Sequence, residues 1–196
     1  MKYVTIFIKY FRKFPIFRFK DARLFLIKNG ASEDYIRKFM SLMIRSGRIY
    51  RITKGSYTLH LDPNIAGFAF RPFYYGLGTA LNFYKMTEQQ YNPIIITPKN
   101  VRSGVRVILG QNTIIRHIKR EFFFGYEKVM GDTFYYYVSD VEKTLIDSVY
   151  YNHVFEVYVY MNIMKKVSIK KLKNYLKKYN KRVKQKTLLL YNKYKK

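Results

Sequence analysis

Three acidic residues and a lysine lie close together in the last third of the chain, at Asp140, Glu142, Lys143 and Asp147. Carboxylates beside a lysine can hold a divalent ion and polarise water, as metal-dependent nucleases do. Those nucleases commonly place Lys two positions after Asp or Glu, and no acid in this chain has that spacing. A nucleotidyltransferase would need a Gly-Ser loop just ahead of Asp140, and none is present there.

A structural role explains the same four residues more fully. Either Ser139 or Asp140 can cap a helix, and Glu142 then favours the positive end of that helix. Asp147 faces Lys143 four residues along the same helix. We therefore expect a helix after residue 140 and no enzymatic activity.

Other residue types that carry chemistry are sparse. His60, His117 and His153 lie far apart, and none pairs with another His or an acid at ligand spacing, so no metal site is expected. The Gly76-Leu77-Gly78 segment has no third glycine and predicts a tight strand-to-helix turn rather than a nucleotide site. The chain has no cysteine, which excludes disulfides and thiolate catalysis. No cofactor is expected.

The positive charge is concentrated at the two ends of the chain. Residues 1–60 hold 14 Lys and Arg against 3 Asp and Glu, a net +11. Residues 61–164 hold 10 against 9, and residues 165–196 hold 14 against none, giving +1 and +14. A charge placed in this way indicates a polyanionic partner, with DNA the first candidate. No uncharged apolar run is long enough for a membrane span, so we expect a soluble, cytoplasmic protein without membrane contact.

Three short helices are predicted in the N-terminal third. Val4, Phe7, Ile8 and Phe11 form one apolar stripe ahead of Pro15. A second helix is expected over 20–28, with Ala22, Phe25 and Leu26 inward. A third begins after Ser32 as its cap, with Ile36, Phe39, Met40 and Met43 inward, and ends at Ser46-Gly47.

Two strand-like runs, 48–52 and 56–60, follow these helices and are joined through Thr53-Lys54-Gly55. Three helices and a hairpin are the order of a winged helix-turn-helix, whose third helix enters the major groove while the wing lies near phosphates. The residues expected to contact DNA are Arg37, Lys38, Ser41 and Arg45 on the third helix and Arg48, Arg51 and Lys54 on the wing.

A strand-rich block with helices is predicted beyond the hairpin, so the fold class is α+β with domains at 1–61 and 62–196. The aromatic runs 122–124 and 135–137 are expected in strands with one face in the core. An apolar helix pair is expected after Ser168, with Ile169, Leu172, Tyr175, Leu176 and Tyr179 inward on the first helix and Val183, Thr187, Leu190 and Tyr194 on the second. Its lysines can be solvated or can contact phosphates. The expected strands are 65–70, 93–97, 105–109, 113–118, 122–129 and 133–138, with a helix near 77–84.

The chain resembles the AbiEi-type antitoxin family of predicted transcriptional regulators. The segments that carry the resemblance are GRIYRITKGSYTLHLDP (47–63), RPFYYGLGTALNFYKMTE (71–88), IIITPKNVRSG (94–104), FFGYEKV (123–129) and VSDVEKTLIDSVYY (138–151). In that family a winged-helix domain precedes such a block, and the acidic motif near residue 140 is a hallmark without assigned chemistry. The very basic C-terminus departs from the usual family pattern.

This resemblance implies a repressor that binds repeats in its own promoter and acts as the antitoxin of a nucleotidyltransferase-like toxin. The C-terminal domain would be the part that counters the toxin. Two alternatives stay open: an antitoxin that works through protein contact with little specific DNA binding, and a nucleic-acid-processing enzyme. The number of copies on DNA is also open, a homodimer being one arrangement.

Overall fold

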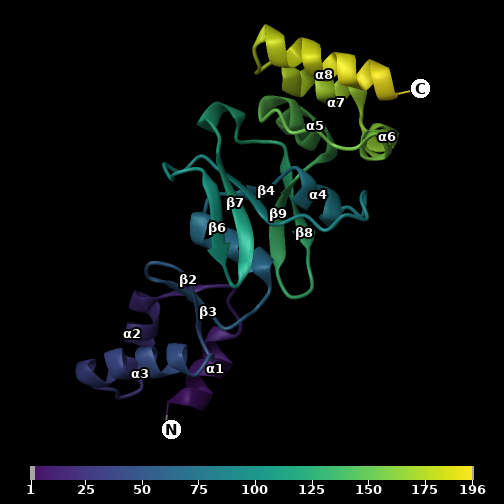
Figure 1. The fold of residues 1–196 in the computed structure, drawn as a ribbon. Coiled ribbons are helices and arrows are strands. Elements are labelled where there is room, and N and C mark those ends of the chain that lie inside the picture. The colour runs from purple at the N-terminus through teal and green to yellow at the C-terminus, as the bar shows by residue number, and fades with distance from the viewer. Residues whose placement is uncertain (1–2, 196) are drawn as a thin grey trace. The chain divides into compact units, whose positions relative to one another are not determined.

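The computed structural model describes residues 3–195 and shows an α+β protein built from two compact units (Figure 1). The first unit comprises the described residues through Arg71 together with Arg106–Asn112. The second comprises Pro72–Val105 and the described residues from Thr113 onward. No helix within residues 3–195 is both long and apolar enough to cross a membrane.

The first unit is a winged helix-turn-helix. Its elements in chain order are α1 (Val4–Phe11), β1 (Phe17–Arg18), α2 (Phe19–Lys28), α3 (Glu33–Arg45), β2 (Tyr50–Thr53), β3 (Ser56–Thr58) and the 3-10 helix η1 (Pro63–Phe70). The three strands form an antiparallel sheet in the order β1-β3-β2. Gly55, with φ of +78°, makes the turn between β2 and β3 that a side chain would strain.

An aromatic core explains why these helices pack together. Phe7 of α1 is fully buried and its ring lies 5.1 Å from that of Phe39 on α3 and 5.5 Å from that of Phe17 on β1. The predicted inward stripes of α1, α2 and α3 are confirmed, although Ile8 and Phe25 are half-buried. Ser32 precedes α3 as predicted, but its side chain makes no capping hydrogen bond.

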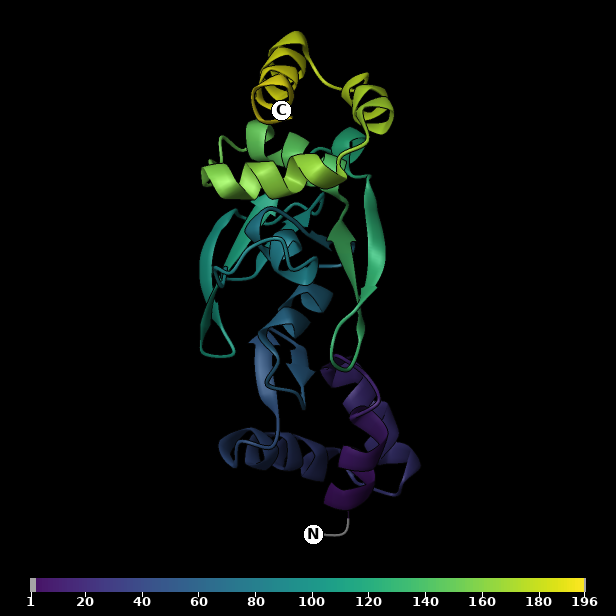
Figure 2. The same ribbon diagram turned by 90° about the vertical axis from the view of Figure 1, so that its right-hand side faces the viewer.

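A six-stranded mixed sheet lies mostly in the second unit, while most of β6 and the start of β7 fall in the segment Arg106–Asn112 of the first. The elements of the second unit are β4 (Tyr74–Tyr75), α4 (Gly78–Phe83), β5 (Ile94–Thr97), β7 (Gln111–His117), η2 (Arg120–Phe122), β8 (Tyr126–Met130), β9 (Tyr135–Ser139), α5 (Val141–Tyr150), α6 (Val157–Lys166), α7 (Ile169–Leu176) and α8 (Lys181–Tyr194). The strand order is β6-β7-β5-β4-β9-β8, where β6 is Gly104–Ile108. Helices α5 to α8 gather at one end of this sheet (Figures 1 and 2).

The fold corrects two expectations from the sequence and adds elements that were not predicted. Residues 65–70 are not a strand but part of η1, because Pro63 opens this helix and the Asp62 carboxylate accepts a hydrogen bond from the Asn64 amide at 2.8 Å. Phe122–Phe124 lie in η2 and the loop after it. The helix α6 and the short strand β1 were not predicted.

The division between the units also differs from the predicted boundary at residue 61. The first unit continues to Arg71, ten residues further along the chain, because η1 packs against β2. The buried side chains of η1, among them Ile65, Phe68 and Phe70, account for this extension. The change to a strand-like composition after residue 61 therefore does not coincide with the end of the first unit.

Candidate functional site

The third helix presents a polar, mostly basic face to solvent. Arg37, Ser41 and Arg45 are spaced by four residues and share one side of α3, and all three are exposed, as is Lys38. Asp34 is exposed near the start of the helix. The opposite side is buried through Ile36, Phe39, Met40 and Met43. Packing of the apolar stripe therefore fixes which side chains point outward.

Glu33, the other acid at the start of α3, is paired with a cation of α2. Glu33 pairs with Arg23 of α2, whose Nε donates to the carboxylate at 3.0 Å. Both partners are largely exposed, so the pair adds little stability. The consequence is electrostatic, because Arg23 offsets the charge of the acid at the first position of a helix with three exposed cations, Arg37, Lys38 and Arg45.

The wing supplies a second group of exposed cations. Arg48, Arg51 and Lys54 are all exposed, on the segment before β2, on β2 and at the hairpin turn. The hairpin is held in place by β1, since Phe17 pairs with Tyr57 of β3 and their rings stack with centroids 6.0 Å apart. The Thr58 hydroxyl donates to the Pro15 carbonyl at 2.8 Å. All seven predicted DNA-contact residues are thus exposed and belong to the first unit.

The acidic motif occupies a different and buried place. The relative exposures of Asp140, Glu142, Lys143 and Asp147 are 8%, 4%, 0% and 0%. Asp140 caps α5, accepting a hydrogen bond from the Lys143 amide at 2.8 Å, and Lys143 pairs with Asp147 one turn on. Both of these interactions were predicted. The complete burial of the pair was not.

Residues distant in sequence complete the inner half of this cluster. The Tyr74 hydroxyl on β4 donates to the second Asp147 oxygen at 2.8 Å. The ammonium group of Lys143 lies 5.3 Å from the centre of the Tyr74 ring and 5.7 Å from that of Phe124. Aromatic faces attract a cation, so these rings replace part of the water that Lys143 loses.

The outer half of the cluster fastens α7 to α5. Lys171 of α7 bridges Asp140 at 3.1 Å and Glu142 at 3.0 Å. The Tyr175 hydroxyl donates to Asp140 at 2.8 Å, and Glu142 accepts from the backbone amide of Ser168 at 2.8 Å. The carboxylates of Asp140 and Glu142 are therefore used in holding a helix. Ser168 precedes α7 as predicted, but the side-chain cap expected there is not formed, and its backbone amide donates to Glu142 instead.

Burial has the largest effect on the pKa values of the inner pair, Lys143 and Asp147. It lowers the pKa of Lys143 and raises the pKa of Asp147, and the attraction between the two charges opposes both effects. Burial also raises the pKa of Tyr74, as does the charge of Asp147. A fully buried ion pair of this kind fits a structural role better than the activation of water. In the described part of the chain, no three His, Cys, Asp or Glu residues are grouped as a metal site.

The remaining sequence candidates lie in separate places. His60 belongs to the first unit, whereas His117 and His153 belong to the second, where burial lowers the pKa of His153. Gly76 and Gly78 flank the turn from β4 to α4, where a Cβ on Gly78 would overlap the ring of Tyr91. The glycines therefore serve close packing at a turn, as the sequence predicts.

The aromatic runs are also explained by packing. Phe122 stacks on Tyr179 with ring centroids 4.4 Å apart, and Phe124 meets Tyr175 edge-on at 5.0 Å. The first contact packs the segment after α7 against η2, and the second packs α7 itself against the loop that follows η2. On β9 the neighbours alternate, with Tyr136 buried and Tyr135 exposed.

Tyr175 makes the docking of α7 sensitive to alkali. Burial and the hydrogen bond to Asp140 raise its pKa to about 12, from an ordinary value near 10. The folded state thus favours the neutral phenol, so its stabilising effect is complete below about pH 10 and is lost as the pH rises to about 12. We expect stability in urea to fall across this interval, and to fall less steeply in Tyr175→Phe. Equal decline in both proteins would contradict this assignment.

The comparisons with known proteins bear on the fold. The sequence matches no protein-family model and no curated protein. The crystal structure of the RV2827C protein from Mycobacterium tuberculosis is similar, with a TM-score of 0.69 at 13% identity, covering 90% of this chain and 71% of that chain. At this identity the likeness shows a shared fold.

Proposed function

We propose that this protein is a sequence-specific, double-stranded DNA-binding transcriptional repressor. One observation carries the proposal: in a winged helix-turn-helix, the outward face of α3 and the wing hold six exposed cations. They are Arg37, Lys38, Arg45, Arg48, Arg51 and Lys54. The helix in this position enters the major groove in proteins of this architecture, and basic side chains beside it meet phosphates.

The two groups of cations have different roles in this proposal. Arg37 and Arg45 stand on the recognition helix, where a guanidinium can donate two hydrogen bonds to the edge of a guanine. Ser41 lies between them and can donate to or accept from a base. Arg51 and Lys54 lie on the wing and neutralise backbone phosphates, which gives affinity without reading the sequence.

The biological setting we propose is a toxin–antitoxin pair whose operon the protein represses. This part rests on the resemblance of residues 47–151 to AbiEi-type antitoxins and names a nucleotidyltransferase-like toxin as the functional partner. An antitoxin that acts by protein contact alone is the alternative. Internal pairing of Asp140, Glu142, Lys143 and Asp147 favours either over a nucleic-acid-processing enzyme, because a catalytic carboxylate must reach its substrate.

Binding to the DNA upstream of the protein's own gene tests the proposal. We expect protected repeats in a footprint and an affinity at least about a thousandfold above that for random duplex. Random duplex alone should bind with a Kd of roughly 10⁻⁴ to 10⁻⁶ M. Equal affinity for upstream and random DNA in parallel titrations would exclude sequence-specific repression and leave the protein-contact alternative.

A further inference from the structure

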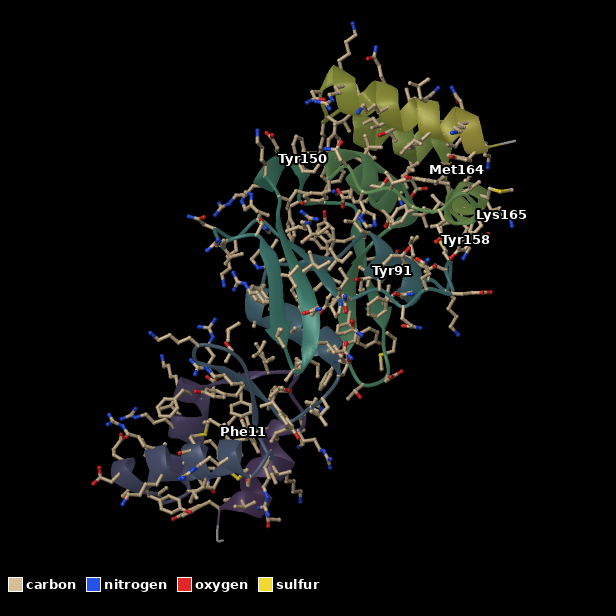
Figure 3. All side chains as sticks on the ribbon, viewed as in Figure 1. Phe11, Tyr91, Tyr150, Tyr158, Met164 and Lys165 are labelled. Atoms are coloured by element: carbon tan, nitrogen blue, oxygen red, sulfur yellow. The ribbon has the colours of Figure 1, made fainter. Side chains whose placement is uncertain are left out.

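The last two helices carry a dense charge of one sign. The sequence from Lys165 onward has 14 Lys and Arg and no acid, and only Lys196 of this set lies outside the described residues. Blue-tipped side chains extend from the outer side of α8 (Figure 3). The exposed cations of α7, α8 and the turn between them are Lys170, Lys171, Lys173, Lys177, Lys178, Lys181, Arg182, Lys186 and Lys193.

The apolar sides of both helices are already used. Leu172, Leu176 and Tyr179 are buried in the core of the second unit, as are Val183 and Thr187. Among the described residues of α7 and α8, Leu189 is the one large apolar side chain that remains exposed. A helix that lies in a membrane surface needs a free apolar face. These helices would have to leave their core to provide one.

The cations have unequal roles. Lys171 is committed to Asp140 and Glu142, and so anchors α7. The others include neighbours of like charge, such as Lys170 and Lys173 on α7 and Arg182 and Lys186 on α8, at spacings of three and four residues. Such pairs repel and weaken a helix. A surface that served solubility alone would mix both signs, whereas a polyanion would relieve this repulsion.

We propose that the outward face of α7 and α8 is a second binding surface for the phosphate backbone of double-stranded DNA. Thirteen of the fourteen cations in the segment are Lys, and Arg182 is the exception. Lysine is a flexible point charge that suits phosphate, whereas base readout favours the fork of Arg or the amides of Asn and Gln. This surface therefore adds affinity and salt dependence to DNA binding but no sequence preference.

The test neutralises four of these lysines in the full chain, as Lys173→Gln, Lys177→Gln, Lys181→Gln and Lys186→Gln together. Binding of a random 30-base-pair duplex is measured by fluorescence anisotropy over a range of salt concentrations. Each phosphate contact contributes about 0.9 to the slope of log K against log salt, so the slope should flatten by up to about 3.6. Affinity at low salt should fall about tenfold or more.

A matched variant controls for net charge. Lys85, Lys99, Lys119 and Lys128 are exposed cations elsewhere in the second unit, and changing them together to Gln removes the same four charges. This control should keep nearly the wild-type slope. Arg at the four positions of α7, α8 and their turn should also keep it, since the charge is conserved. Circular dichroism and Tm verify that every variant is folded.

Three outcomes would overturn the inference. In the first, the Gln variant binds duplex with the wild-type affinity and salt slope. In the second, the control variant loses as much duplex affinity as the Gln variant does. In the third, the Gln variant keeps its duplex affinity and loses binding to phosphatidylserine vesicles or polyglutamate. Failure here is distinguishable from failure of the proposed repressor function. The Gln variant should retain the ratio of operator to random affinity, whereas changes at Arg37 and Arg45 should reduce that ratio and leave most random-duplex binding intact.

Discussion

Replacing Arg37 and Arg45 together with alanine is expected to lower operator affinity by about 10²- to 10³-fold. A side chain that reads a base edge contributes about 1–3 kcal/mol, and both arginines are exposed on the same side of α3. Random-duplex affinity should fall far less, because only two phosphate-attracting charges are lost. Gel-shift titrations with operator and random DNA at one salt concentration give both numbers.

Two further variants make this result specific. The double variant Lys9→Ala, Lys13→Ala removes two exposed charges, one on α1 and one just after it. It should change operator affinity little. Arg51→Ala with Lys54→Ala on the wing should weaken operator and random binding alike and reduce the salt slope by about 1 per residue. If the wing variant lost specificity while the α3 variant kept it, the docking geometry that we propose would be wrong.

The same α3 variant separates repression from antitoxin activity. Expressed beside the neighbouring toxin, it should still restore growth if the second unit counters the toxin without operator binding. The toxin must be placed under an independent promoter, so that loss of repression does not raise its level. Failure to restore growth, despite wild-type amounts of folded protein, would mean that antitoxicity depends on DNA binding.

Replacing Lys143 with methionine is expected to destabilise the second unit by about 3–5 kcal/mol. Asp147 would be left as a buried charge without its partner, which is the costly way to break such a pair. A loss of this size corresponds to roughly 10–20 °C in Tm for a unit of this length. Urea unfolding followed by circular dichroism measures it directly.

A double variant shows whether the charge is the cause. Lys143→Met with Asp147→Asn removes both charges and leaves an amide oxygen that can accept the hydrogen bond from Tyr74. We expect it to regain more than half of the lost stability, because a neutral buried pair avoids the desolvation cost. A double variant as unstable as Lys143→Met alone would assign the loss to packing rather than to the unpaired carboxylate.

The sequence by itself determined the elements whose signals are local. The buried side of α3 follows from the spacing of Ile36, Phe39, Met40 and Met43, and the hairpin follows from a glycine at the turn. The cap at Asp140 and the pairing of Lys143 with Asp147 are equally local, since they join residues three and four positions apart. Periodicity and the Asp140 cap are read correctly because the interacting atoms belong to one turn of helix, whereas the side-chain caps expected at Ser32 and Ser168 are not formed.

The surroundings of that pair were decided by tertiary structure. Tyr74 and Tyr175 are 73 and 35 residues away in sequence from the aspartates that they contact. No local spacing in the sequence predicts these two contacts. The same holds for β1, whose two residues become a strand only by pairing with β3. Packing also placed Asp147 and Lys143 at 0% exposure, where composition predicts solvent. Burial depends on which distant surfaces meet, and here it enclosed an ordinary helical ion pair together with Tyr74 of β4.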